Sequence, residues 1–276
     1  MAIQLGTVAP IGFKDFPPAE WLACYRQLGC TVVQAYRNQQ AGVTVEQMKE
    51  AVAAGQMPCD SLHGVFGEQF DPSACEEPHR QFAVDAYRRE GDLALELGGS
   101  LVVVHCSTIR REGIGDEEKR LRWAQFRRSV EELGEHGRHL GVTYAFENLP
   151  NYHCIGNDVA ELAAVLDELA VPNTGMCLDT GHAHMTGDLP ASARAAGAQV
   201  LYVHLSDNSG SGDDHEMPTY GTQDCLALAD ALRDVRYGGT MMLEVFHTAD
   251  RLREMIDEGL ADRLAEILDR ANGRTH

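Results

Sequence analysis

The chain has 276 residues, of which 44% are hydrophobic and 24% charged, a composition typical of a globular protein with a substantial core. Its 23 Lys and Arg residues face 42 Asp and Glu residues, which gives a net charge of −19. This negative charge repels phosphate backbones and anionic membrane surfaces, so we expect neither a nucleic acid nor a membrane as partner.

The N-terminal residues lack the basic and apolar regions of a signal peptide, and no apolar run reaches the roughly 20 residues of a membrane helix. The eight cysteines form no CxxC pair and several lie in apolar runs, so they are expected to be reduced, buried thiols. We therefore expect a soluble, cytoplasmic protein. The sequence leaves its oligomeric state open, and a homo-oligomer is one option.

Short apolar or β-branched runs recur along the chain and predict eight strands, at residues 3–8, 31–36, 60–65, 101–107, 143–148, 175–180, 201–206 and 240–246. Amphipathic stretches between them predict helices. The helix before the fourth strand is expected to bury one face, composed of Phe82, Ala83, Ala86, Tyr87, Leu93, Ala94 and Leu97. The last predicted helix is continuous and buries apolar residues from Leu252 to Leu268.

Strands that alternate with helices pair in parallel, because each crossover needs a helix. Eight such units in a chain of this length predict the α/β fold of a (β/α)₈ TIM barrel. An open, doubly wound sheet is the alternative. No low-complexity linker or break in composition divides the chain, so residues 1–276 are expected to form one domain.

Six of the predicted strands carry an ionisable residue near the C-terminal end: His63, His105, Glu147, Asp179, His204 and Glu244. Side chains alternate along a strand, and the immediate neighbours of these residues are mostly apolar. Those neighbours are expected to face the helices, which turns the six ionisable side chains toward the barrel axis. They would then meet at the C-terminal mouth, where barrel enzymes have their active sites.

Three of these residues are carboxylates, Glu147, Asp179 and Glu244, which would repel one another unless a cation lay among them. We therefore predict a site for one divalent metal ion, with His204 as a fourth, neutral ligand. The carboxylate-rich set favours Mn²⁺, Mg²⁺ or Co²⁺ over a structural zinc, with Mn²⁺ as first choice and Zn²⁺ as an alternative.

Two further histidines lie beyond the strands. His182 follows Asp179 by three residues, and the loop after the seventh strand contains Asp213, Asp214 and His215. His215 could orient a ligand, bind substrate or join a second metal. Since GxxxxGK[ST], GxGxxG and GxSxG motifs are missing, no nucleotide cofactor and no serine nucleophile are expected.

The segments FENLP, LDTGHAHMTGD, VHLSDN and LEVF resemble the xylose isomerase-like barrel superfamily, and within it the sugar-phosphate isomerase and epimerase group. The resemblance implies a metal held by Glu147, Asp179, His204 and Glu244. It also implies that His63, His105, His182, Asp213 and His215 line the pocket of a small sugar or keto-polyol substrate.

The resemblance implies isomerisation or epimerisation through a metal-stabilised enediolate, with Glu147 and Glu244 as catalytic acid and base. The chain departs from the family pattern at one place. Members that epimerise free ketoses at the third carbon have a segment similar to HxxENxR after the seventh strand. Here the segment reads His204-Leu-Ser-Asp-Asn-Ser, without the arginine. Asp207 of this segment is neither a proposed ligand nor a proposed base, so its replacement by Asn should cost far less activity than replacement of Glu147 or Glu244 by Gln.

Three alternatives remain. A hydroxypyruvate-type isomerase, a polyol dehydratase or a keto-glycoside lyase would use the same site. DNA-repair endonucleases with a trinuclear zinc cluster resemble the chain at His63, His105, Glu147, Asp179, His182, His204, Asp213, His215 and Glu244, but the charge of −19 argues against DNA binding. The last alternative is a barrel that binds a ligand without catalysis.

Overall fold

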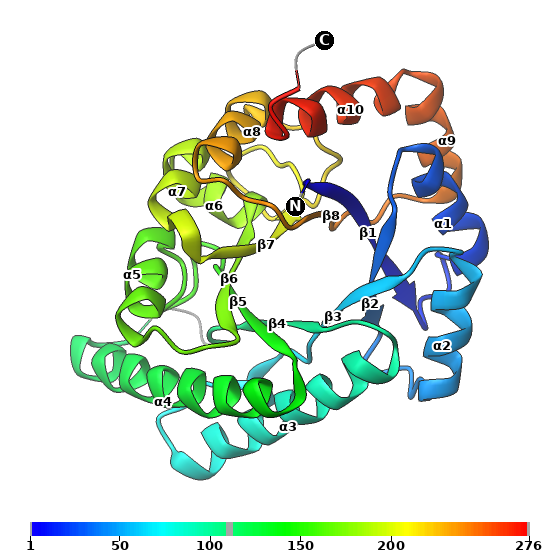
Figure 1. Cartoon of the computed structure of the whole chain (residues 1–276). Coiled ribbons are helices and arrows are strands. Elements are labelled where there is room, and N and C mark those ends of the chain that lie inside the picture. Colours follow the sequence, from blue (N-terminus) through cyan, green and yellow to red (C-terminus); the bar gives the residue numbers. More distant parts are fainter. Residues whose placement is uncertain (1, 109–112, 275–276) are drawn as a thin grey trace.

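The computed structural model describes residues 2–108 and 113–274, whose parallel strands close into one barrel in the order β1 to β8 (Figure 1). The strands are β1 (Gln4–Ile11), β2 (Val32–Arg37), β3 (Cys59–His63), β4 (Leu101–His105), β5 (Thr143–Glu147), β6 (Thr174–Asp179), β7 (Val200–Leu205) and β8 (Thr240–Leu243). The predicted (β/α)₈ fold and all eight predicted strands are thus confirmed, with ends shifted by a few residues. One shift matters, because Glu244 is the first residue after β8.

Helices surround the barrel as an outer layer (Figure 1). They are α1 (Pro18–Gln27), α2 (Val45–Ala54), α3 (Glu77–Glu96), α4 (Asp116–Leu140), α5 (Val159–Leu169), α6 (Thr180–Thr186), α7 (Leu189–Ala196), α8 (Cys225–Asp234), α9 (Ala249–Asp257) and α10 (Leu260–Ala271), with short 3₁₀ helices η1 (Glu68–Phe70) and η2 (Gly197–Gln199). Within the described residues, none of these helices has both the length and the apolar character needed to span a membrane.

Two predictions about helices were wrong. The last helix is not continuous, because Gly259 has a φ of 82° and separates α9 from α10. Phe82 does not lie in the core: 49% of its surface is exposed, although Ala83 and Tyr87 on the same helix are fully buried. Spacing along the helix could not reveal that the face carrying Phe82 borders an open cleft.

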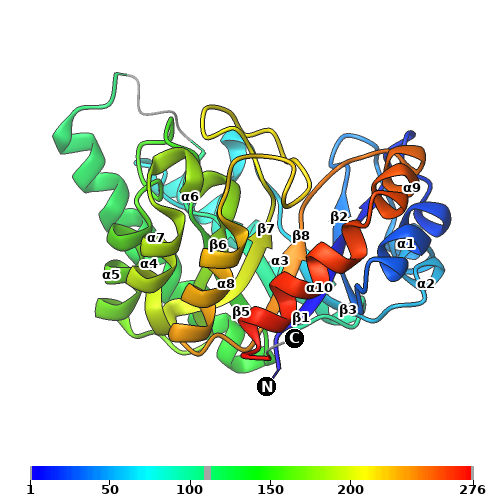
Figure 2. The same ribbon diagram turned by 90° about the horizontal axis from the view of Figure 1, so that it is seen from above.

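The strand register places the ionisable residues beside one another. His105 pairs with Glu147 across β4 and β5, and Asp179 pairs with His204 across β6 and β7. In a parallel barrel the strand ends lie at one mouth, so residues in register there can share a site. Figure 2 shows the connection between β7 and α8 at this end, while both chain termini lie at the other.

Candidate metal centre and active site

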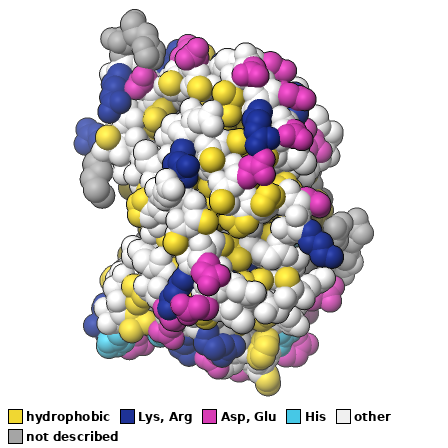
Figure 3. All heavy atoms as spheres, turned by 90° about the vertical axis from the view of Figure 1, so that its right-hand side faces the viewer, with side chains coloured by type: hydrophobic (Ala, Val, Ile, Leu, Met, Phe, Trp, Pro, Cys, Tyr) yellow, Lys and Arg dark blue, Asp and Glu magenta, His cyan; other side chains and the backbone are white. Residues whose placement is uncertain are grey.

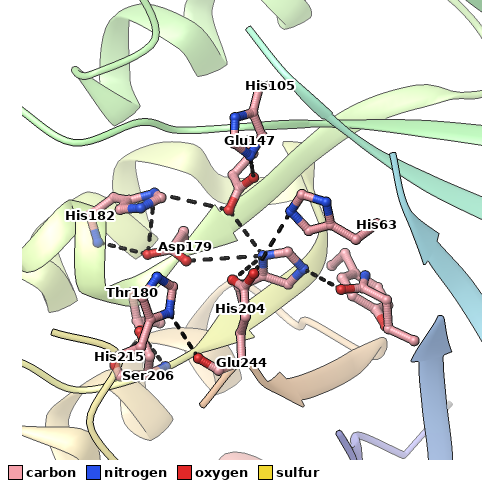
Figure 4. A network of polar contacts seen from close by, with 12 residues as sticks. His63, His105, Glu147, Asp179, Thr180, His182, His204, Ser206, His215 and Glu244 are labelled. Carbon is pink, nitrogen blue, oxygen red and sulfur yellow. Dashed lines mark hydrogen bonds and ion pairs between the residues drawn. The ribbon is translucent and has the colours of Figure 1, made fainter. Parts of the chain in front are cut away.

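Four ionisable side chains from neighbouring strands converge at the mouth of the barrel (Figure 4). Glu147 ends β5, Asp179 ends β6, His204 lies in β7, and Glu244 follows β8. One potential ligand atom of each lies within 4.8 Å of those of the others. All four are buried, with at most 4% of the surface of any one exposed. The structure thus brings together the four residues for which a metal site was predicted.

His204 lies at the centre of this group. Its Nδ1 atom is 3.0 Å from Glu147 Oε1 and 2.9 Å from Glu244 Oε2. The Asp179 Oδ2 atom lies 4.0 Å from the same nitrogen. One imidazole nitrogen therefore faces three carboxylates.

The other nitrogen of His204 contacts the side chain of Gln34 from β2, with a distance of 3.1 Å between Nε2 and Oε1. Since the Gln34 amide group donates to Ser61 Oγ, its oxygen is the atom that faces the histidine and can only accept. His204 therefore donates from Nε2–H to Gln34, and its Nδ1 atom faces the carboxylates, where it would offer a lone pair to a bound metal ion. This is the orientation that a metal-binding histidine needs. Without an ion, its close contacts with Glu147 and Glu244 are favourable only with a proton on Nδ1.

Asp179 is positioned by backbone and side-chain contacts on both sides. Its main-chain N–H donates to Asn148 Oδ1, and its carbonyl accepts from Asn148 Nδ2. Its Oδ1 atom accepts from the main-chain N–H of His182 and so caps the first turn of α6. The next residue but one after Asp179, Gly181, lies very close to Ser206, because a Cβ atom on Gly181 would be only 2.7 Å from Ser206 Oγ. Glycine at this position lets α6 begin directly against β7.

The electrostatics of the group reflect its concentration of negative charge. Burial, together with the charges of Glu147 and Glu244, raises the pKa of Asp179 to about 6. Burial by itself would raise the pKa of Glu147, but His204 and His105 outweigh it and hold that pKa well below its ordinary value. Burial opposes a charge on His204, yet Cys177, Glu244 and Glu147 raise its pKa well above the ordinary value. The group therefore attracts positive charge strongly.

The donor set fits a divalent cation. Asp179 Oδ2 is fully buried and accepts no hydrogen bond from the described residues. A buried carboxylate oxygen without a partner is costly, and a metal ion would satisfy it. Three carboxylates and one imidazole suit Mn²⁺, Mg²⁺ or Co²⁺.

Two of the predicted substrate-binding histidines lie on the β3 and β4 side of the group. His105 Nε2 is 3.1 Å from Glu147 Oε2, and His63 Nε2 is 3.7 Å from Glu244 Oε1. His63, His105 and Glu147 are also close enough to hold a metal ion together. Burial lowers the pKa of His63 to about 4, so this histidine is neutral and can act as a ligand or a hydrogen-bond partner.

The other predicted residues form a cluster on the opposite side. Asp213 lies between two histidines, with Oδ2 3.3 Å from His182 Nε2 and Oδ1 3.4 Å from His215 Nε2. His182 Nδ1 contacts the carbonyl of Asn148, and His215 Nδ1 contacts that of Glu244. These contacts fix both rings beside the proposed metal ligands. The structure thus gathers all nine predicted site residues around one mouth.

The structure gives Asp207 a role that its place in the sequence did not indicate. Asp207 is fully buried, and its carboxylate accepts hydrogen bonds from the main-chain N–H groups of Asn208, Thr219, Gly221 and Gln223. It therefore holds together the loop that carries Asp213 and His215. Its replacement would disturb the site indirectly, which makes Asp207 unsuitable as a neutral control.

Sequence reasoning missed two further groups. The first is Gln34, whose signal was a polar residue within the apolar run TVVQAY. The second is a set of aromatic rings that contact the site histidines. Tyr36 lies 4.6 Å from His63, Phe66 lies 5.4 Å from His105, and Phe246 lies 6.0 Å from His215, measured between ring centroids. These residues come from separate loops and strand ends, so no local pattern joined them.

Comparison with known proteins agrees with this geometry. Residues 22–270 match the model of a protein family described as "Xylose isomerase-like TIM barrel". The chain belongs to this family. It is also 23% identical over 224 residues to an uncharacterised protein of Methanocaldococcus jannaschii, a match that covers 73% of this chain and 72% of that protein. The predicted superfamily is therefore confirmed.

Two solved structures share the fold of this xylose isomerase-like barrel. An L-ribulose 3-epimerase superposes with a TM-score of 0.75 and 19% identity, covering 97% of this chain and 98% of the other. A 3-keto-D-glucoside 4-epimerase from E. coli superposes with a TM-score of 0.74 and 18% identity, covering 96% and 98%. At these identities the likeness concerns the fold.

Proposed function

We propose that the protein is a divalent-metal-dependent isomerase or epimerase that acts on a keto sugar or keto-polyol. The observation that carries the proposal is the buried group of Glu147, Asp179, His204 and Glu244, with potential ligand atoms within 4.8 Å of one another. The fold neighbours named above are sugar epimerases, which supports the same reaction class for this chain.

Glu147, Asp179, His204 and Glu244 would hold the ion. When bound, it would polarise the substrate carbonyl and stabilise the negative charge of an enediolate. Glu147 and Glu244 flank His204 from β5 and from the end of β8. In the proposed reaction one of these carboxylates removes the proton from the carbon next to the carbonyl, and the other returns a proton. Return to the opposite face gives epimerisation, and return to the neighbouring carbon gives isomerisation.

The histidines on either side would orient the substrate. His63 and His105 lie on one side of the carboxylates, and His182 and His215 are held on the other by Asp213. Imidazole groups can donate hydrogen bonds to substrate hydroxyls and to the developing oxyanion. A dehydratase or keto-glycoside lyase would use the same proton abstraction, so these reactions are variants of the proposal.

Solvent-deuterium exchange tests the proposal. Purified protein is loaded with Mn²⁺ and incubated in D₂O with a panel of ketoses, 3-keto-glucosides and keto-inositols. We expect deuterium at the carbon next to the carbonyl of an accepted substrate, even where net conversion is small. No incorporation into any member by fully metal-loaded protein would contradict the proposal.

One observation favours a second candidate, a metal-dependent endonuclease. His63, His105 and Glu147 form a second potential metal site that shares Glu147 with the first. The net charge of −19 opposes it, because phosphate attraction dominates non-specific DNA affinity. On the face shown in Figure 3, Lys and Arg side chains are dispersed among Asp and Glu side chains and form no basic stripe on the part drawn in colour. Efficient nicking of a duplex with an abasic site, at low enzyme concentration, would favour the endonuclease.

A further inference from the structure

A cleft of about 1120 Å³ opens beside the barrel mouth, and its walls are unusually aromatic. Five of the eight phenylalanines of the protein line it, together with one tyrosine. The aromatic residues of the cleft are Phe13, Phe16, Tyr36, Phe66, Phe82 and Phe246. We call this space the aromatic cleft.

The aromatic cleft borders the candidate active site. Tyr36 contacts the ring of His63, Phe66 contacts that of His105, and Phe246 contacts that of His215. Each of these three aromatic residues therefore has the cleft on one side and a site histidine on another. The cleft and the site histidines are thus adjacent, with one aromatic ring between them at each of these three places.

Most of these rings pack against one another, and they are only partly covered by protein. The centroids of Tyr36 and Phe246 are 5.3 Å apart, and Phe246 also lies 6.1 Å from Phe16. On the α3 side, Phe82 stacks on Phe70 at 5.9 Å and leaves 49% of its surface exposed. Apolar rings gathered around one concave space are typical of a ligand site, because burying them against a ligand is favourable.

The volume indicates the size of the ligand. Pockets of roughly 300–1,000 Å³ enclose molecules of drug size. The aromatic cleft alone slightly exceeds that range, and the carboxylates of the candidate active site lie outside its lining. A single sugar ring bound at the carboxylates would leave the cleft empty.

The charges in the cleft indicate that this part of the ligand is uncharged. Among the described residues, Arg37 is the only Lys or Arg in the lining, and its guanidinium is 2.6 Å from Glu90 Oε1. This ion pair is largely buried, so the charge of Arg37 is already compensated. The lining also includes Glu68. In the described part of the lining, no Lys or Arg lacks an acidic partner, so a neutral aromatic group fits these residues better than a phosphate group.

We propose that the substrate is a keto sugar that carries an uncharged aromatic substituent, as in an aryl glycoside, and that the substituent binds in the aromatic cleft. The inference rests on the proposed function, since the sugar ring is placed at Glu147 and Glu244. It adds the substrate class: a glycoside rather than a free or phosphorylated monosaccharide.

The test compares 4-nitrophenyl 3-keto-β-D-glucopyranoside with methyl 3-keto-β-D-glucopyranoside in the Mn²⁺-loaded enzyme. The readout is kcat/KM for deuterium incorporation from D₂O. Burial of one aromatic ring predicts a preference of about 10- to 100-fold for the nitrophenyl compound. Phe82→Ala should reduce this preference about 2- to 10-fold by raising KM, and leave the methyl compound unaffected.

Leu95→Ala is the matched control. Leu95 lies on the same helix and is 40% exposed, but it does not line the cleft, so this variant should retain the full preference. Equal kcat/KM for the two compounds would overturn the inference and leave the proposed function standing. A change in the oligomeric mass of Phe82→Ala without a change in preference would also overturn it, because the cleft would then bind a second copy of the chain.

If neither compound incorporates deuterium, the proposed function fails for 3-keto-glucosides. A binding measurement then tests separately whether the cleft recognises an aryl group. Calorimetric titration with 4-nitrophenyl β-D-glucopyranoside, which cannot react, should give an affinity that Phe82→Ala weakens and Leu95→Ala does not. Binding no tighter than that of methyl β-D-glucopyranoside would show that the cleft does not recognise the aryl group.

Discussion

The Oε1 atom of Gln34 lies 3.1 Å from the Nε2 atom of His204, on the side of the ring away from the three carboxylates. The contact continues through Ser61 Oγ, which is 2.5 Å from Tyr202 Oη and 2.8 Å from Asp60 Oδ1. A chain of buried polar groups thus runs from the candidate metal centre into the barrel interior. We infer that Gln34 is a positioning residue, which orients His204 without touching the substrate.

This relationship predicts that Gln34→Met lowers the affinity for Mn²⁺ by about 10- to 100-fold, because His204 loses the acceptor that fixes its proton on Nε2. Metal titration measured by calorimetry is the readout. Ser61→Ala removes a contact one step further from the ring and should have a smaller effect. Equal affinities in wild type and Gln34→Met would refute the positioning role.

The proposed proton transfer predicts that Glu147→Gln and Glu244→Gln each lower the rate of deuterium exchange by about 10²–10⁴-fold. The amide keeps one oxygen as a potential ligand but cannot accept the substrate proton. Metal occupancy is measured in each variant, so that lost metal and lost base are separated. Asp214→Asn is the control, since Asp214 is exposed and lies beside Asp213 in the same loop. Near-normal exchange by both glutamine variants at full occupancy would mean that the carboxylates are ligands only.

The buried donor set predicts about one divalent ion per chain in the purified protein, and a melting temperature that falls when a chelator removes it. Elemental analysis and thermal melts measure the two quantities. Two or more ions per chain would indicate that the group of His63, His105 and Glu147 is occupied as well. A metal-free protein whose melting temperature does not respond to added Mn²⁺ would argue against the site.

Asp207→Ala is predicted to destabilise the protein by about 2–4 kcal/mol, because it leaves buried main-chain N–H groups without an acceptor. Urea unfolding measures the loss. We also expect reduced exchange activity, since the loop anchored by Asp207 carries Asp213 and His215. Unchanged stability would show that water replaces the carboxylate at these donors.

The amino-acid sequence was enough to predict the barrel and to group the residues of the candidate centre. Alternation along a strand decides which side chains point inward, and parallel strands of a barrel end at one mouth. These two rules were enough to group Glu147, Asp179, His204 and Glu244. These inferences depend on local periodicity and on one topological rule.

The residues that surround that centre became apparent in the folded structure. Gln34 reaches His204 across the barrel from β2, and Asp207 closes its own loop through main-chain contacts with residues as far along as Gln223. Phe82 is in the right helical phase for the core, yet it faces the aromatic cleft. Helical and strand periods report burial against the nearest layer. They carry no information about which distant loops meet at the barrel mouth, and that meeting decides the shape and charge of the space open to a substrate.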